Sequence, residues 1–354
     1  MSYKFNPFTG KLDDVSANTV TPGVIDNAIV RADGTGNNAI QGSDINIDDA
    51  TTSTQTNVAI VNQHTGQTNS ALVLTPKGTG ALIAGPKPDG TTVGGNARGA
   101  GCVDLQRVRN AATQVAVSTN SVISGGQNNS IPSSALVTSV VISGGSSNTA
   151  TGTTSVISGG STNTVSGGAS VISGGSSNTA SAQFATVSGG FSNTASFGSS
   201  SISGGRQALA DRWGMRAYSA GQFAAQGDAQ HGIFVLRCIT TTNTAVEMAL
   251  DGVTTYLTIP SGKVMAMNIN ISGVSSDGSA VAHYLRQYAV KNVAGTSSQV
   301  YAPVTIGTDN AAGTSIALSV NDTDDSVRIA VTGVVSQTWR WVATVDAVEI
   351  GYGT

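Results

Sequence analysis

Side chains that could bind a metal or form a disulfide are few in this 354-residue chain and lie far apart. The three histidines are His64, His231 and His283, and the two cysteines are Cys102 and Cys238. None of them stands at zinc-site spacing, where ligands recur roughly two to five residues apart. The cysteines fall in different segments, so we expect no disulfide and two reduced, buried thiols. These residues therefore predict no metal site.

Two short motifs have the residue types of a ligand-binding loop. GTGNNA at Gly34 fits the loose GxGxxA pattern, but no helix is expected after it, so it does not predict a dinucleotide site. Asp322, Asp324 and Asp325 cluster in one turn and could hold Ca²⁺. An Asp-rich turn between two strands explains the same residues without an ion. We favour that interpretation, and we expect no cofactor.

Hydrolytic chemistry has no recognisable motif in this chain. The sequence contains neither a GxSxG nucleophile elbow nor a GK[ST] phosphate loop. A glycosidase needs two carboxylates in a cleft, and no acidic residue occurs between Gln106 and Ala210. We therefore expect a protein that is not an enzyme, with cleavage of a polysaccharide as the alternative.

One segment carries residues suited to binding a sugar. In VAHYLRQYAV, Tyr284, Arg286 and Tyr288 alternate along the chain and so share one face of a strand. Aromatic rings stack on sugar rings, and arginine hydrogen-bonds their hydroxyl groups. The same residue types are enriched in interfaces between proteins. We favour a face that packs in the core or between subunits, and contact with a receptor is the alternative.

A repeat in the middle of the chain indicates its fold. Paired glycines mark it, and they recur with one step of 19 residues followed by four steps of 15. A fixed period of this kind indicates a solenoid, whose coils stack on one another. Each pair can turn the chain, because glycine adopts positive φ angles without strain. The pairs are Gly125 and Gly126, Gly144 and Gly145, Gly159 and Gly160, Gly174 and Gly175, Gly189 and Gly190, and Gly204 and Gly205.

Each coil keeps one aliphatic residue two positions before its glycines, as expected for a row of stacked interior side chains. These residues are Ile123, Ile142, Ile157, Ile172, Val187 and Ile202. The preceding position faces the other way and changes from valine in the first four coils to Thr186 and Ser201. An outer face that is apolar over four coils needs cover that one chain does not supply. We expect other copies of the chain to supply it.

The remaining positions of the repeat are polar. An asparagine follows the glycines at a fixed offset, as at Asn163, where it can hold a turn or form a stacked amide ladder. Fifteen residues suit a flattened coil with two strands. A flexible linker is the alternative for a tract rich in Ser and Gly, but a linker has no reason to keep an aliphatic residue at one phase of the period.

The repeat unit SVISGGSSNTAS resembles the head repeat of trimeric autotransporter adhesins of the YadA kind, a trimeric left-handed parallel β-roll. The N-terminal KFNPFTGKLD (4–13), the segments 74–106 and 210–230, and the C-terminal part look like bacteriophage tail-fibre proteins. This resemblance implies a homotrimer with its N-terminus at the virus particle and its C-terminus facing the host. An adhesin would also need a signal peptide and a membrane barrel segment, and neither is recognisable here.

Shifts in composition divide the chain into five expected segments. They are a virion-attachment peptide (1–20), a proximal β shaft or small β domain (21–120), the β-roll repeats (121–210), a neck (211–230) and a C-terminal, jelly-roll-like antiparallel β-sandwich that would bind the receptor (231–354). In the neck, Trp213, Met215, Tyr218 and Phe223 are expected to plug the end of the roll.

Together these features predict an all-β, elongated, homotrimeric tail fibre that attaches a bacteriophage to a glycan on the host cell. Its N-terminus would bind a tail or baseplate protein. With 10% charged residues and a net charge of −3, neither nucleic-acid binding nor membrane insertion is expected. The N-terminus has no apolar run of signal-peptide length, which favours synthesis in the host cytoplasm and residence in the virion. The alternatives are a tailspike depolymerase, a capsid head fibre and a bacterial trimeric adhesin.

Overall fold

A computed structural model describes residues 3–6, 11–14, 76, 78–132 and 137–352. The chain divides into two compact units, Met1–Leu72 and Val73–Thr354. In the first unit, β1 (Tyr3–Asn6) and β2 (Lys11–Asp14) form an antiparallel hairpin within the expected attachment peptide. The expected shaft lies outside the described residues from 21 to 75. No described helix is long and apolar enough to cross a membrane.

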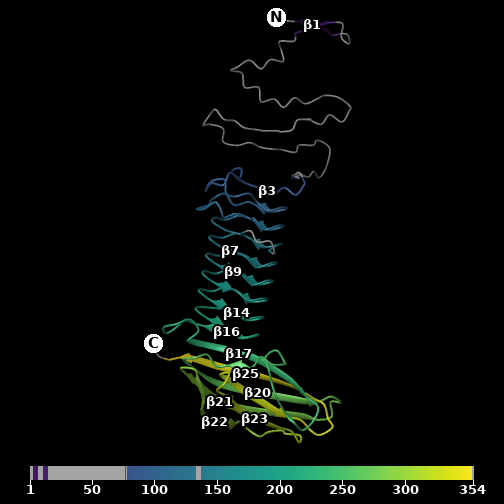
Figure 1. Cartoon of the computed structure of the whole chain (residues 1–354), viewed down its shortest axis with the longest axis vertical. Coiled ribbons are helices and arrows are strands. Elements are labelled where there is room, and N and C mark those ends of the chain that lie inside the picture. The colour runs from purple at the N-terminus through teal and green to yellow at the C-terminus, as the bar shows by residue number, and fades with distance from the viewer. Residues whose placement is uncertain (1–2, 7–10, 15–75, 77, 133–136, 353–354) are drawn as a thin grey trace. The chain divides into compact units, whose positions relative to one another are not determined.

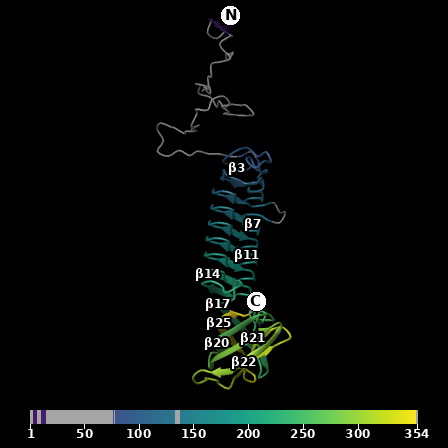
Figure 2. The same cartoon turned by 90° about the vertical axis from the view of Figure 1, so that its left-hand side faces the viewer.

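The second unit begins with a β-solenoid, which Figures 1 and 2 show as a stack of short arrows. Parallel strands in matching register build one side of it. They are β3 (Leu82–Ile83), β4 (Val103–Asp104), β5 (Val122–Ile123), β6 (Val141–Ile142), β8 (Val156–Ile157), β10 (Val171–Ile172), β12 (Thr186–Val187), β14 (Ser201–Gly205) and β16 (Arg216–Ser219).

A second parallel sheet forms the other side of the solenoid. Its strands are β7 (Thr149–Ala150), β9 (Thr164–Val165), β11 (Thr179–Ala180), β13 (Thr194–Ala195) and β15 (Leu209–Ala210). Each coil in this stretch therefore contributes two strands, which confirms the expected flattened coil. The left hand of the roll and its assembly as a trimer stay predictions.

The interior of the solenoid is filled by two facing rows of stacked apolar side chains. The aliphatic residue before each glycine pair is 0% exposed in all six coils, from Ile123 to Ile202. Across the coil it faces the second sheet, whose inward residues, such as Ala180, are buried as well. The outward valines of the first sheet, as at Val156, are only half-buried in the single chain.

The solenoid extends beyond the expected limits of 121 and 210. β3 and β4 are in parallel register with β5, so coils already form within the segment expected to be a separate shaft. β16 adds a coil within the expected neck. The early coils show no fixed period in the sequence, because their lengths differ: Leu82 and Val103 are 21 residues apart, and Val103 and Val122 are 19 apart.

The same turn geometry recurs in successive coils and depends on the Asn and Gly positions of the repeat. The backbone N–H of Asn178 donates to Oδ1 of Asn163 at 3.0 Å, and the same bond joins each Asn to the next along the stack. Each side-chain amide also donates to two glycine carbonyls, one in its own coil and one in the next. Gly175 has a φ of +81°, and a Cβ there would lie 2.2 Å from the carbonyl oxygen of Gly190.

The C-terminal part is an antiparallel β-sandwich, which confirms the expected architecture. Its larger sheet continues the first solenoid sheet through the antiparallel pairing of β16 with β17. That sheet runs β17 (Ala229–Thr240), β25 (Trp339–Gly351), β20 (Lys263–Ser275), β21 (Val281–Val293), β22 (Thr296–Thr305). The smaller sheet contains β18 (Ala245–Glu247), β19 (Leu257–Thr258), β23 (Ser315–Asn321) and β24 (Ser326–Thr332).

The end of the solenoid is closed by charged side chains and not by the expected aromatic plug. Of the four residues expected there, Met215 is buried, but Trp213, Tyr218 and Phe223 are 39%, 51% and 76% exposed. Arg212 lies at this junction instead, 4% exposed and paired with the buried Glu349 of β25. The aromatic side chains are thereby left on the surface, where they can contact other molecules.

Candidate functional site

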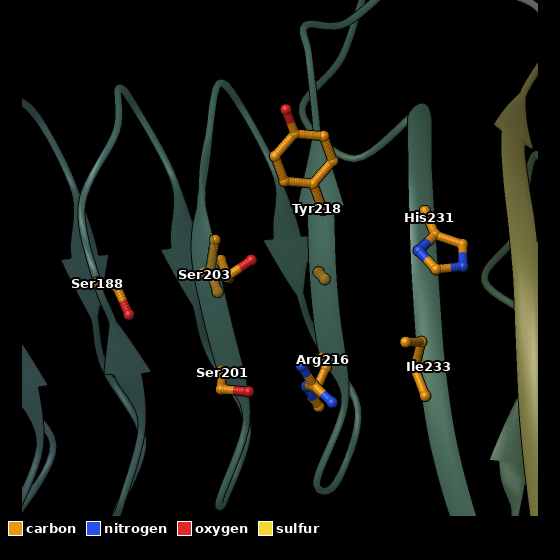
Figure 3. A pocket seen from close by; sticks show the side chains of 9 residues that line it. Ser188, Ser201, Ser203, Arg216, Tyr218, His231 and Ile233 are labelled. Carbon is orange, nitrogen blue, oxygen red and sulfur yellow. The ribbon is translucent and has the colours of Figure 1, made fainter.

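Three hollows open where the solenoid meets the sandwich. The first hollow has a volume of about 300 Å³ and lies over the outer face of β14, β16 and β17 (Figure 3). It is lined by Ser188, Ser201, Ile202, Ser203, Arg216, Ala217, Tyr218, His231 and Ile233. Its polar groups come from four neighbouring strands or the residues directly after them, so the sheet itself fixes their spacing.

Strand alternation turns the chemical groups of the first hollow outward. On β16, Arg216 and Tyr218 are exposed, while the residues beside them are buried. The register places Arg216 between Ser201 of β14 and Ile233 of β17. It also places Tyr218 opposite His231, and directly opposite residues in an antiparallel pair have Cβ atoms about 5 Å apart.

His231 is oriented by a carboxylate from the next strand. Its Nε2 lies 2.7 Å from Oδ1 of Asp346 on β25, and both side chains are partly exposed. Figure 3 shows the other ring nitrogen of His231 turned toward β16. A histidine held in this way can accept or donate a proton at its free nitrogen, because the carboxylate fixes the orientation of the ring.

Arg216 has no charged partner within the described part of the chain. Several of the other arginines there pair with carboxylates, as in Arg98–Asp104, Arg212–Glu349, Arg286–Asp309 and Arg328–Glu247. Asp346, on β25 two strands away, is engaged by His231. The first hollow therefore presents an uncompensated guanidinium group beside hydroxyl groups and an aromatic ring.

The second and third hollows continue the first around the junction. The second, of about 370 Å³, shares Tyr218 and His231 with the first and adds Phe223. The third, of about 510 Å³, shares Phe223 with the second and reaches Tyr352, which is 39% exposed. We call the three together the junction groove. Exposed aromatic rings thus occur along its whole length.

The loop that carries Phe223 is held by a carboxylate. Asp228 accepts hydrogen bonds from the backbone N–H groups of Phe223, Ala224 and Ala225 at 2.7–2.8 Å. Burial would raise the pKa of Asp228, but these hydrogen bonds outweigh it and leave the pKa below its usual value. The Tyr352 hydroxyl donates to the carbonyl of Asn292. The Phe223 ring is therefore presented on anchored backbone, and the Tyr352 ring is held by its own hydroxyl group.

The sugar-binding face expected from VAHYLRQYAV packs in the sandwich core. Tyr284 and Tyr288 are 3% and 0% exposed, and Arg286 forms a two-bond ion pair with Asp309. The three residues do share one face, but that face is the inner one, in line with the interpretation favoured from the sequence. Receptor contact through these residues is not supported, because their rings are covered.

The other candidate residues are not brought together. Asp322 and Asp325 accept hydrogen bonds from Ser297, and Asp324 pairs with Arg328. Cys102 and Cys238 are both free and buried. His283 contacts Ser272, whereas His64 and the GTGNNA motif lie outside the described residues. Among the residues that the structure does describe, no three His, Cys, Asp or Glu side chains gather as metal ligands.

Sequence reasoning missed the site at the junction. Arg216 and Tyr218 alternate along one strand, which was a usable signal that they share a face. His231 and Asp346 are 115 residues apart in the chain. Only the pairing of β17 with β16 and β25 brings them beside that strand, and no local pattern announces this pairing.

No protein-family model matches the chain, and no curated protein matches it. Solved structures give distant likenesses to bacteriophage tailspikes. One is tailspike protein gp49 of Acinetobacter baumannii bacteriophage Fri1, a capsular polysaccharide depolymerase, with a TM-score of 0.23, 12% identity and coverage of 75% of this chain and 46% of that one. Others are the tailspikes of Acinetobacter phage vB_ApiP_P1 (TM-score 0.21, 12% identity, 66% and 51% covered) and A. baumannii phage AM24 (0.18, 7%, 66% and 55%).

The chain spans about half the length of these structures. The matches contradict the expectation that the protein is not an enzyme, because the Fri1 protein is a depolymerase. That expectation is withdrawn. TM-scores near 0.2 are too low to transfer an activity, so the case for a function rests on the residues of this chain.

Proposed function

We propose that the protein is a spike or fibre of a bacteriophage virion that binds a polysaccharide of the host cell surface along the junction groove. The observation that carries this proposal is the run of exposed aromatic rings through three linked hollows, with Tyr218 51% and Phe223 76% exposed. Rings that remain exposed on anchored backbone can stack on sugars, and the hydroxyl groups beside them can bind sugar hydroxyls.

The placement in a virion is supported by the sequence resemblance to tail fibres. In this proposal the N-terminal region binds the tail or baseplate, and the second unit faces the host. Three copies assemble through the outer valines of the solenoid, which are half-buried in one chain, as at Val156 and Val171. The three grooves of one trimer would raise the avidity for a repetitive polymer well above the affinity of one groove.

Cleavage of the bound polysaccharide is the second candidate function. The observation that favours it is the His231–Asp346 pair opposite Tyr218, since these groups can transfer protons at a bound sugar. Incubation with purified capsular polysaccharides and lipopolysaccharides tests it. Released oligosaccharide that disappears in the His231→Ala variant would support cleavage, whereas binding without release would leave attachment alone.

Binding is tested by measuring the affinity of the full chain for the same panel of polysaccharides. Tyr218→Ala and Phe223→Ala should each weaken binding about 2- to 10-fold, as expected for the loss of one stacking ring. Tyr301→Ala is the matched control, because Tyr301 is 43% exposed on β22 and does not line the groove. Equal losses in all three variants, or no loss in the groove variants, would contradict the proposed site.

A further inference from the structure

The first hollow differs from the other two in its charge. Its lining contains one permanent cation, Arg216, one histidine and no carboxylate. Asp346 of β25, two strands from Arg216 in the sheet, is 2.7 Å from His231 and is therefore already engaged. A guanidinium left without a counter-ion in a lined hollow is suited to a ligand that brings its own negative charge.

We propose that the first hollow is a subsite for a sugar unit that carries a carboxylate, such as a uronic acid, and that Arg216 binds this carboxylate. The inference rests on the proposed function, and it adds the chemical class of the polysaccharide. Arg216 presents a planar fork of N–H donors, which matches the two oxygens of a carboxylate and can bind both.

The groups around Arg216 fit the rest of such a sugar. Ser201 lies beside it in register, and Ser188 and Ser203 line the same hollow. Their hydroxyl groups can donate to and accept from the neutral hydroxyls of a sugar ring. Tyr218, two residues along the same strand, offers its ring for stacking. A sugar bound at Arg216 would therefore have both hydroxyl groups and an aromatic ring in the same hollow.

The charge balance favours a carboxylate over a phosphate monoester. A monoester carries close to two negative charges at neutral pH, and Arg216 is the single permanent cation among the lining residues. The three serines add only neutral donors. One negative charge on the sugar would match one guanidinium.

The experiment compares acidic polymers with chemically neutralised twins. Hyaluronan, polygalacturonate, alginate and polysialic acid are each prepared in native form and with their carboxylates reduced to alcohols. Affinities of the full chain are measured at one fixed salt concentration. We expect at least one native polymer to bind about 10- to 100-fold more tightly than its reduced twin, the range for a charge-assisted hydrogen-bonded contact.

Variants of Arg216 test whether this residue causes the preference for the native polymers. Arg216→Gln should bind the native and reduced polymers equally, and Arg216→Lys should keep part of the preference, because lysine retains the charge but not the fork. Arg340→Gln is the control, since Arg340 is an exposed arginine of β25 outside the groove. Equal binding of native and reduced polymers by the unmodified protein, or a preference that survives in Arg216→Gln, would overturn the acidic-sugar subsite while leaving the proposed function intact. Failure to bind any polymer in either form, together with no binding to the capsule and lipopolysaccharide panel, would overturn both.

Discussion

Nη2 of Arg212 donates to both carboxylate oxygens of Glu349 at 2.6 Å, and this bond joins the last solenoid coil to the final strand of the sandwich across 137 residues of sequence. Gln230 adds a bond to the same carboxylate at 3.1 Å, and the guanidinium lies 4.9 Å from the Phe234 ring centre. Burial opposes the charge of Arg212, but Glu349 outweighs it and raises the pKa above its usual value. The solenoid and the sandwich are thus connected by a buried ion pair.

Removing one partner of this pair should destabilise the protein strongly. We expect Glu349→Gln or Arg212→Met to lower the free energy of unfolding by up to about 3–5 kcal/mol, because each removes the closest partner of a buried charge. The remaining partners are Asp211, 3.0 Å from Arg212, and Lys263, 3.5 Å from Glu349. Urea denaturation followed by circular dichroism measures the change. Asp346→Asn is the control, since its ion pair with His231 is partly exposed and should contribute less than about 1 kcal/mol. A loss of stability in Asp346→Asn as large as that in Glu349→Gln or Arg212→Met would contradict the role assigned to the buried pair.

The two glycines of one repeat should respond differently to the same substitution. A Cβ on Gly175 would lie 2.2 Å from the Gly190 carbonyl oxygen, at a φ of +81°, whereas a Cβ on Gly174 would meet no atom within 4 Å. Gly175→Ala should therefore lower stability by about 2 kcal/mol or more, and Gly174→Ala should change it by less than about 0.5 kcal/mol. Thermal unfolding of the pair checks this, and equal effects would show that stacking does not require the second glycine.

Loss of one asparagine should weaken the ladder locally. Asn163→Ala removes the acceptor for the backbone N–H of Asn178 and two donors to glycine carbonyls, all in the buried stack. We expect a loss of about 1–3 kcal/mol, because a buried N–H is left without a partner. Hydrogen exchange should rise first in the coils that flank residue 163. Thr162→Ala, at the exposed neighbouring position, should leave the exchange pattern unchanged.

Alkaline pH should destabilise the fold through a buried thiol. Burial raises the pKa of Cys238 from 9.0 to about 11. Between these values the unfolded chain loses the thiol proton while the folded chain keeps it, so this contribution to stability is present below pH 9 and is lost as the pH rises to 11. The loss should reach up to about 3 kcal/mol, since each pKa unit corresponds to about 1.4 kcal/mol. Denaturant midpoints of the unmodified protein and Cys238→Ala measure it, and parallel pH profiles would contradict the prediction.

If copies of the chain assemble through the outer valines, the same substitution should have different effects in neighbouring coils. Val171 and Thr186 occupy the same outward position in adjacent coils. If copies of the chain associate there, Val171→Lys should dissociate the oligomer, whereas Thr186→Lys should be tolerated because its position is already polar. Light scattering gives the mass of each variant. A monomer for the unmodified protein would refute association, and a stable oligomer of Val171→Lys would exclude this face.

The periodic part of the fold was predictable because stacking repeats one environment in every coil. Ile123 and Ile202 occupy equivalent buried positions, so their shared phase in the sequence reports the structure directly. Coils at Leu82 and Val103 escaped notice because loops of different length separate them, and a fixed period no longer marks them. The inward face of β21 was also ambiguous, since alternation reveals two faces but not which one is covered.

The junction groove could not be predicted, for a different reason. Its residues belong to strands whose pairing is set at long range, as His231 and Asp346 illustrate. The aromatic side chains of the expected neck suggested a plug, because large rings near a terminal coil are usually buried. The Arg212–Glu349 ion pair lies there instead, and Tyr218 and Phe223 are exposed on the surface.

The coils that carry Asn148, Asn163, Asn178 and Asn193 offer their successors the same Asn amide, the same Gly carbonyls and an aliphatic side chain at the same position. A gene that duplicates or deletes one fifteen-codon unit would therefore change the reach of the protein by about 4.8 Å without altering the chemistry at either end. If the protein is the proposed virion fibre, recombination alone could adjust the distance that it spans, in uniform increments, and leave the proposed junction groove unchanged.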